Sequence, residues 1–236
     1  MTNHSTKTLL HLTYGLVRSK TLLLLSLYHL TCFAQDRSEI LNWFDLITGE
    51  ELFISSDIKT IDGYPVMRGQ HPFFPDDKFY RSKIKYNNQD FYELITYNIY
   101  KDELVLYTPN EENTQVKLVN NKVTSFSLAN KWFVNLAKYG FSEVLSQSSE
   151  SALYVKHTKK MINRRRGIVA FEKKESFFLF HNNTYRDIKS KTDWIKAFPS
   201  KKNKIEFYYS KHGDILDESP TNFAKNLFNH LTKEAK

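Results

Sequence analysis

Apolar and polar residues alternate along much of the chain between residues 80 and 128. Within 80–86 the apolar positions share one face of an extended strand and the basic positions share the other: Tyr80, Ile84 and Tyr86 against Arg81, Lys83 and Lys85. This period of two is typical of an antiparallel sheet with one solvated face. Turns are expected at 87–90, 101–103 and 120–121, where Asn and Asp gather, because these residues tolerate positive φ. The pattern predicts a meander of antiparallel strands.

The following stretch continues this plan. Residues 131–160 hold two apolar runs on either side of the polar segment SQSSES, which predicts two strands and a turn. Residues 168–188 repeat the arrangement, with EKKES between two apolar runs and a second turn at HNN. We therefore expect the chain to remain in short antiparallel strands as far as residue 188.

From residue 190 onwards the apolar residues follow a helical spacing, and three short helices are expected. Their boundary signals are a cap at Ser190 or Thr192 with a stop at Pro199, an end at Gly213, and a cap at Ser219 followed by Pro220. The last helix places four apolar residues on one face: Phe223, Leu227, Phe228 and Leu231. This face is expected to dock on the sheet.

The predicted fold class is therefore α+β and mostly β. It is an antiparallel β-meander, or a sandwich or half-barrel, closed by short C-terminal helices from about residue 190. Hydrophobic residues make up 41% of the 236-residue chain and aromatic residues 15%, which is sufficient for a core. No stretch rich in Pro, Gly or Ser marks a boundary, so residues 35–236 are expected to form a single β-rich domain.

Residues 1–34 have the three-part layout of a secretory signal peptide. A cationic region without acids precedes the apolar run TLLLLSLYHL, and small residues follow at Cys32 and Ala34. We expect cleavage between Ala34 and Gln35 and export to the periplasm, the outer-membrane surface or the medium. Two alternatives stay open, an N-terminal membrane anchor and a lipoprotein modified at Cys32.

After such cleavage the chain would contain no cysteine and thus no disulfide or thiol nucleophile. Its histidines lack the spacing of a metal site, and no P-loop, G-x-S-x-G or dinucleotide motif is present. The sequence therefore indicates no catalytic, cofactor-binding or metal-binding residues and no transmembrane span in the mature chain. Its charge is uneven, because 35–154 carries 12 cations and 17 anions whereas 155–211 carries 16 cations and 5 anions.

The strongest local signal is KKMINRRRGIVAFEKK at 159–174. Its first cations form a candidate anionic-surface contact: Lys159, Lys160, Arg164, Arg165 and Arg166. Three interpretations apply, namely nucleic-acid binding, contact with anionic envelope lipid, and a solvated hairpin whose cations protect a sheet edge. We favour the third and expect no nucleic-acid partner, since an exported protein rarely meets one.

A second candidate is the segment RGQHPFFPDDKFY at 68–80, which concentrates aromatic residues and prolines. Its candidate partner-binding residues are Arg68, His71, Phe73 and Phe74. The alternative is that this loop folds its phenylalanines over an open end of the sheet, and we favour that alternative.

Two stretches carry a family resemblance: FYRSKIKYNNQDFYELITYNIYKDELVLY and FFLFHNNTYRDIKSKTDWIKAFPSKKNKIEFYYSKH. With them the chain resembles a group of secreted, β-rich proteins of the Bacteroidetes type that have no assigned activity. The resemblance includes a C-terminal element matched here by Tyr185, Ile188, Lys189, Lys191, Asp193, Trp194, Lys196, Phe198 and Pro199. It implies an envelope location and this fold plan, and it supplies no catalytic residues.

The sequence thus favours a non-enzymatic exported protein of the cell envelope, a β-rich binding or accessory module. Its expected partner is an envelope protein or an anionic lipid. The alternatives are a hydrolase acting on envelope or extracellular polymers and a lipid-binding carrier formed by a curved sheet closed by helices.

Overall fold

The structure is a computed structural model, which describes residues 60–61, 64–108, 114–164 and 167–233. The expected signal peptide, its cleavage site after Ala34 and the alternative lipid site at Cys32 lie outside these residues. In the described part the fold is α+β and mostly β, an open antiparallel sheet followed by short C-terminal helices, as the sequence predicts. None of the described helices combines the length and apolar character that crossing a membrane would need.

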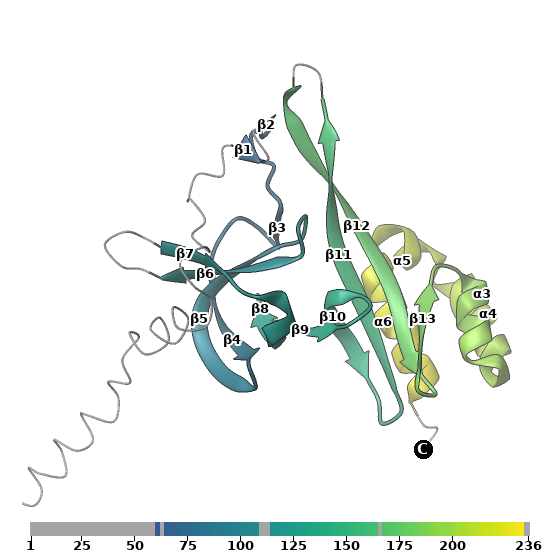
Figure 1. The fold of residues 1–236 in the computed structure, drawn as a ribbon. Helices are drawn as coiled ribbons and strands as arrows, with labels where there is room; N and C mark the ends of the chain where they lie inside the picture. The colour runs from purple at the N-terminus through teal and green to yellow at the C-terminus, as the bar shows by residue number, and fades with distance from the viewer. Residues whose placement is uncertain (1–59, 62–63, 109–113, 165–166, 234–236) are drawn as a thin grey trace, which may run out of the picture. The chain divides into compact units, whose positions relative to one another are not determined.

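One antiparallel sheet of eleven strands has the order β13-β12-β11-β10-β9-β8-β4-β5-β6-β7, and β3 also pairs with β5 (Figure 1). The short strands β1 (Thr60–Ile61) and β2 (Tyr64–Pro65) pair separately. The strands of the large sheet are β3 (Phe73–Phe74), β4 (Tyr80–Tyr86), β5 (Gln89–Asn98), β6 (Glu103–Thr108), β7 (Thr114–Lys117), β8 (Val123–Leu128), β9 (Lys131–Leu136), β10 (Gly140–Gln147), β11 (Ser151–Asn163), β12 (Val169–His181) and β13 (Thr184–Ile188).

The sheet curls, and this brings the turn after β5 against β11. The backbone N–H of Lys159 donates to the carbonyl of Ile99 at 3.3 Å, although β5 and β11 are not neighbours in the strand order. An aromatic core fills the inside of the curve. Its side chains are fully buried and meet as stacked or edge-on rings: Tyr97, Phe126, Phe133 and Phe141.

Three of the predicted turns lie where Asn and Asp gather, whereas Asn120 and Asn121 belong to a 3₁₀ helix (Asn120–Lys122). Positive φ occurs at Asn87 and Asn88, at Asp102, and at Asn182 and Asn183, so these turn predictions are confirmed. The strand predictions between them were less accurate. Residues 131–160 contain three strands rather than two, because a further turn at 137–139 separates β9 from β10.

The prediction that EKKES forms a separator at 172–176 was wrong, because β12 runs through it without a break. The thirteen residues of β12 pair one for one with the thirteen residues of β11. This pairing places polar residues opposite each other, with Lys160 beside Glu172 and His157 beside Glu175. Glu172, Lys173 and Lys174 are exposed on this strand, so a run of charged residues did not mark a turn here.

Four α-helices follow the sheet, one more than predicted. They are α3 (Lys191–Ala197), α4 (Lys202–Lys211), α5 (Gly213–Glu218) and α6 (Pro220–Thr232), and a 3₁₀ turn, η3 (Pro199–Lys201), precedes α4. Ser190 caps α3 by accepting from the N–H of Asp193, as expected. The predicted end of the second helix at Gly213 is not where it ends, since α4 stops at Lys211 and Gly213 begins α5. The hydroxyl of Ser219 makes no cap bond to α6.

The apolar face of α6 packs on β10 and β11. All four of its predicted residues, Phe223, Leu227, Phe228 and Leu231, are buried. They share one core cluster with Trp194 and Ile205 from the preceding helices. Phe207 in α4 is 61% exposed and does not join this core. The helices therefore cover one face of the sheet, as the sequence predicts.

Candidate functional site

The hairpin of β11 and β12 continues beyond the strands that flank it. Strand β10 pairs with β11 only from Ala152 to Val155, and β13 pairs with β12 only from Phe177 onwards. The arm, defined here as residues 156–176 of this hairpin, is therefore a two-stranded ribbon for most of its length (Figure 1). Such a ribbon is marginally stable alone, so its orientation depends on the contacts made at its base.

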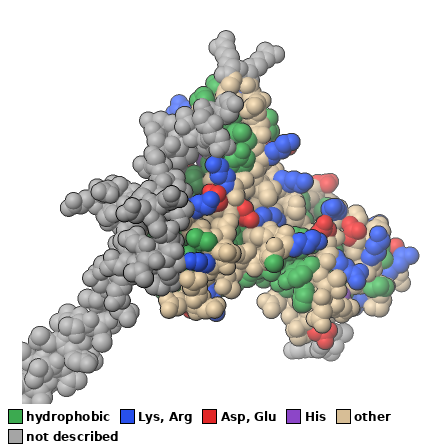
Figure 2. Space-filling model, viewed as in Figure 1, with side chains coloured by type: hydrophobic (Ala, Val, Ile, Leu, Met, Phe, Trp, Pro, Cys, Tyr) green, Lys and Arg blue, Asp and Glu red, His purple; other side chains and the backbone are tan. Residues whose placement is uncertain are grey.

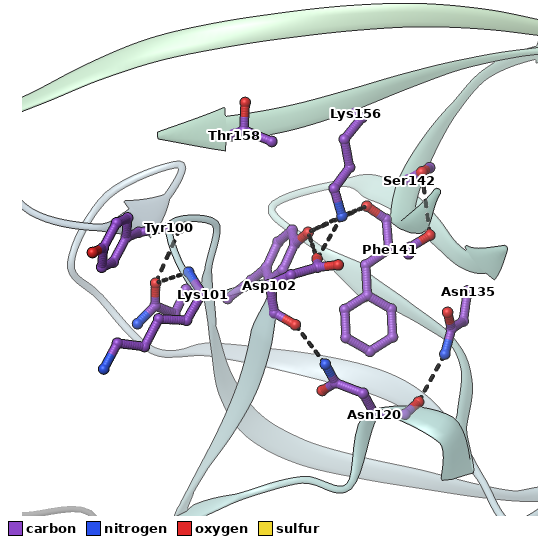
Figure 3. A network of polar contacts seen from close by, with 12 residues as sticks. Tyr100, Lys101, Asp102, Asn120, Asn135, Phe141, Ser142, Lys156 and Thr158 are labelled. Atoms are coloured by element: carbon purple, nitrogen blue, oxygen red, sulfur yellow. Dashed lines mark hydrogen bonds and ion pairs between the residues drawn. The ribbon is translucent and has the colours of Figure 1, made fainter. Parts of the chain in front are cut away.

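The first contact is made by Lys156 at the start of the arm (Figure 3). Its ammonium lies 2.6 Å from the carboxylate of Asp102, 3.0 Å from the carbonyl of Phe141 and 3.3 Å from the hydroxyl of Tyr97. Three N–H donors thus find three acceptors, as a mostly buried ammonium requires. Burial lowers the pKa of Lys156, while Asp102 acts in the opposite direction. Burial also raises the pKa of Tyr97, which donates to Asp102 as well.

Two asparagines hold the turn that carries Asp102. The side-chain amide of Asn120 donates to the carbonyl of Asp102 at 2.7 Å, and the amide of Asn135 donates to the carbonyl of Asn120 at 2.7 Å (Figure 3). Gly140 lies against the carboxylate of Asp102, where a Cβ would stand 2.1 Å from Oδ2. The position of Asp102 is therefore fixed from three sides, and Lys156 with it.

The second contact is made by His157, which is 2% exposed. Its Nε2 lies 2.6 Å from Glu143 in β10, and its Nδ1 lies 3.3 Å from Glu175 in β12. Phe74 stacks on the imidazole with ring centroids 4.5 Å apart. The hydroxyl of Thr221 in α6 donates to Glu175 at 2.6 Å. This chain of contacts ties the base of the arm to the sheet and to the last helix.

Glu143 and Glu175, the two carboxylates that contact His157, each also have a lysine partner. Lys131 lies 2.6 Å from Glu143, and Lys173 lies 2.7 Å from Glu175. Burial opposes ionisation of Glu143, but hydrogen bonds from His157 and Lys131 outweigh it, and the pKa of Glu143 is lowered. The neighbouring His157 lowers the pKa of Glu175 well below its usual range; burial opposes this, and Lys173 and Thr221 add to it. Both groups are thus held as ions by their neighbours, an arrangement suited to an ion-pair lock.

The third contact joins the two candidate sites that the sequence treats as separate. The ammonium of Lys159 donates to the carbonyl of His71 at 2.7 Å and to that of Phe73 at 3.0 Å. Burial lowers the pKa of Lys159, and nearby Lys173 adds to this effect. Burial, and then Lys159, also lower the pKa of His71. Lys159 is therefore an anchor of the arm and not one of its solvated cations.

The loop at 66–71 also forms hydrogen bonds with the N-terminal end of β12. The N–H of Met67 donates to the carbonyl of Val169 at 2.9 Å, and the N–H of Phe171 donates to the side chain of Gln70 at 3.1 Å. Phe73 and Phe74 are only 9% and 5% exposed, so the structure places them in the core. Their positions agree with the alternative in which the loop folds over the sheet.

The remaining candidate residues stay at the surface. Arg68, Lys160 and Arg164 are exposed, as are Lys173 and Lys174 on the opposite strand, while Arg165 and Arg166 lie outside the described residues. Ile168 near the turn is 37% exposed, and Met161 and Ile162 are half-buried. Figure 2 shows Lys and Arg side chains beside hydrophobic ones along this hairpin. The distal arm, defined here as residues 160–174 of the hairpin, is therefore a cationic surface with apolar side chains among its charges.

Sequence reasoning missed the anchors Asp102, Glu143, Lys156 and His157. Only Lys156 and His157 carry a usable signal. They follow the apolar run at 152–155 with no turn residue between, which indicates that they continue the same strand. Among the described residues, no group of three or more His, Cys, Asp or Glu side chains is arranged to hold a metal ion.

The fold and the anchored arm together define a β-rich protein with a projecting cationic hairpin. No family model matches the chain, and no curated protein or solved structure is significantly similar to it.

Proposed function

We propose that the protein is an exported, non-enzymatic binding module of the cell envelope that contacts an anionic lipid surface through the distal arm. One observation carries the proposal: the base of the arm is fixed by three polar anchors, while its distal half offers exposed cations and an exposed isoleucine. A fixed ribbon presents its charges to a flat surface without first losing conformational freedom.

The composition of the distal arm suits a lipid surface. From Lys159 to Lys174 the sequence has seven cations and one acid, Glu172. Two of the cations have partners within the protein, since Lys159 binds the loop at His71 and Lys173 pairs with Glu175. Each remaining cation near an anionic membrane contributes roughly 1 kcal/mol, and Ile168 can enter the interfacial region.

The polar cluster at His157 gives less support to the hydrolase alternative. A glycoside hydrolase needs two carboxyl groups free to act on one bond. Here Glu143 and Glu175 both contact His157, and each also has a lysine partner. The cluster is therefore better explained as the lock that holds the arm to the sheet and to α6.

The test is co-sedimentation with lipid vesicles, using protein in the form that the host produces. Vesicles with half phosphatidylglycerol are compared with pure phosphatidylcholine, at low and high salt. Replacing Arg164, Arg165 and Arg166 by serine should weaken binding to the anionic vesicles by roughly 3 kcal/mol, about 100-fold. The free energy of unfolding should change by less than about 1 kcal/mol, as for most surface substitutions.

A matched control removes three exposed lysines from the helices instead: Lys196, Lys204 and Lys225, each replaced by serine. This variant has the same net charge as the arginine variant, so it should bind the anionic vesicles within a few-fold of the unaltered protein. Equal losses in both variants would mean that net charge alone drives binding. Binding that is as strong to neutral vesicles as to anionic ones would also contradict the proposal.

A further inference from the structure

Strands β10 to β13 have a second face, opposite the helices. Leu153, Val155 and Leu179 point toward the helical core, and their neighbours along the strands point the other way. In Figure 1, α6 lies behind these strands, and Figure 2 shows hydrophobic side chains gathered over the same strands on the near face. The register places aromatic residues there in adjacent strands: Tyr154 opposite Phe178, and Phe180 opposite Tyr185.

These aromatic side chains form a supported floor. Phe178 is buried beneath Tyr139, with ring centroids 3.9 Å apart and planes 7° apart. Tyr185 lies 4.9 Å from Phe180 and 6.2 Å from Tyr154, tilted toward both, and is 38% exposed. Rings that pack on each other in this way keep their faces in fixed positions.

A pocket of about 510 Å³ lies over part of this floor. Its aromatic lining comes from Tyr154, Phe180 and Tyr185, and Ala152 of β11 lines it as well. Two turns form its rim, the β10–β11 turn at 147–151 and the β12–β13 turn at 182–183. The rim is made of Ser, Gln, Asn and Glu side chains, most of them exposed. Its volume lies within the range of roughly 300–1,000 Å³ that small-ligand sites occupy.

We infer that this pocket binds a pyranose ring of a neutral glycan. One face of a pyranose carries C–H bonds, which pack against the electron-rich face of an aromatic ring. Its hydroxyl groups both donate and accept hydrogen bonds, and the amides of Asn182, Asn183 and Gln147 do the same. An aromatic floor with an amide and hydroxyl rim matches both properties of a sugar at once.

Two other ligand classes fit less well. An acyl chain would make no use of the polar rim, because it offers no hydrogen-bonding groups. A nucleic acid would stack on the same floor but needs cations for its phosphates. Among the described residues that line the pocket none is Lys or Arg, and Glu150 adds a negative charge. The site is also built from other residues than the arm, so the inference does not depend on lipid binding.

The experiment screens the protein against an array of neutral pyranose oligosaccharides. Cellopentaose, maltopentaose and chitopentaose are then titrated by calorimetry and by saturation-transfer NMR. At least one glycan should bind saturably, and Tyr185→Ala should weaken that binding by about tenfold or more, as the loss of one stacking ring implies. Tyr185→Phe keeps the ring and should stay within about threefold of the unaltered protein.

Two further variants keep the test decisive if Tyr185→Ala does not fold. Asn183 has a φ of 56°, which glycine adopts freely, so Asn183→Gly removes a rim amide without backbone strain. It should weaken binding several-fold. Tyr92, 61% exposed on β5, is the matched aromatic control, and Tyr92→Ala should leave glycan binding unchanged.

Absence of saturable binding to every glycan on the array would overturn the inference. Equal loss in Tyr92→Ala and Tyr185→Ala, or tighter binding of single-stranded oligothymidine than of any glycan, would overturn it as well. The arm variant Arg164→Ser/Arg165→Ser/Arg166→Ser should keep glycan binding, and Tyr185→Ala should keep vesicle binding. Failure of the glycan site is therefore distinguishable from failure of the proposed lipid contact.

Discussion

Replacing Gly140 by alanine tests whether the Asp102–Lys156 contact fixes the base of the arm. Gly140 has a φ of +67°, and a Cβ there would stand 2.1 Å from Oδ2 of Asp102 and 3.0 Å from Nζ of Lys156. Gly69 provides a matched control, because its φ is +76° and a Cβ would meet nothing within 4 Å. Both substitutions place alanine in the left-handed region, and only one displaces the carboxylate.

The expected magnitudes follow from this difference. Alanine in the left-handed region costs about 1–2 kcal/mol, and this is the full effect expected for Gly69→Ala. In Gly140→Ala the Asp102 carboxylate must move away, which leaves the ammonium of Lys156, 14% exposed, without its anion. A hydrogen bond to a charged group contributes about 1.5–3 kcal/mol. Gly140→Ala should therefore lower the free energy of unfolding by about 2.5–5 kcal/mol.

Urea unfolding followed by circular dichroism measures both variants. With an m-value of about 2 kcal/mol/M, the unfolding midpoints of the two variants should differ by about 1 M. Asp102→Asn supplies the companion measurement, because Gly140→Ala should cost less in that background if both changes act on the same contact. Equal destabilisation by Gly140→Ala and Gly69→Ala would refute the reasoning and make the contact incidental.

Two further predictions concern the helical cover and the lock at His157. Leu227→Ala should lower the free energy of unfolding by about 2–5 kcal/mol, because Leu227 is fully buried. Lys225→Ala, on the exposed face of α6, should change it by less than about 0.5 kcal/mol. Comparable losses for the two variants in urea unfolding would contradict the packing of α6. Glu175→Gln should flatten the pH dependence of stability. The folded-state pKa of Glu175 is depressed, so its contribution is present above the unfolded value of roughly 4.3 and is lost as pH falls below it. Melting temperatures between about pH 2 and 6 measure this, and a slope unchanged from that of Glu218→Gln would contradict it.

Local signals explain why so much of the fold could be predicted from the sequence. Asn182 and Asn183 determine their own turn, since both adopt positive φ. Leu227 and Leu231 are four residues apart, about one helical turn, so both fall on the buried face of α6. Neither inference requires knowledge of a distant partner. The face of α6 was therefore predicted correctly, while the number of helices was not.

Features that depend on distant pairing were not predictable in the same way. The segment EKKES has the composition of a turn, and only its pairing with β11 makes it a strand. Asp102 is 54 residues from Lys156, and Glu143 is 14 residues from His157. The sequence predicts Asp102 as a turn residue, and the structure places it in a turn with a φ of 58°. Its second role as an anchor follows only from the curl of the sheet.

The register of the hairpin separates neighbouring cations that the sequence presents as one cluster. Successive side chains of a strand point to opposite faces, so Lys159 reaches the loop at His71 while Lys160 remains exposed. A slip of one residue would turn Lys159 to the other face of the strand and move its ammonium away from the carbonyls of His71 and Phe73. The contact of Lys159 with this loop therefore favours the observed register. The same register that directs Lys159 to the loop leaves Lys160 on the opposite, exposed face of the strand.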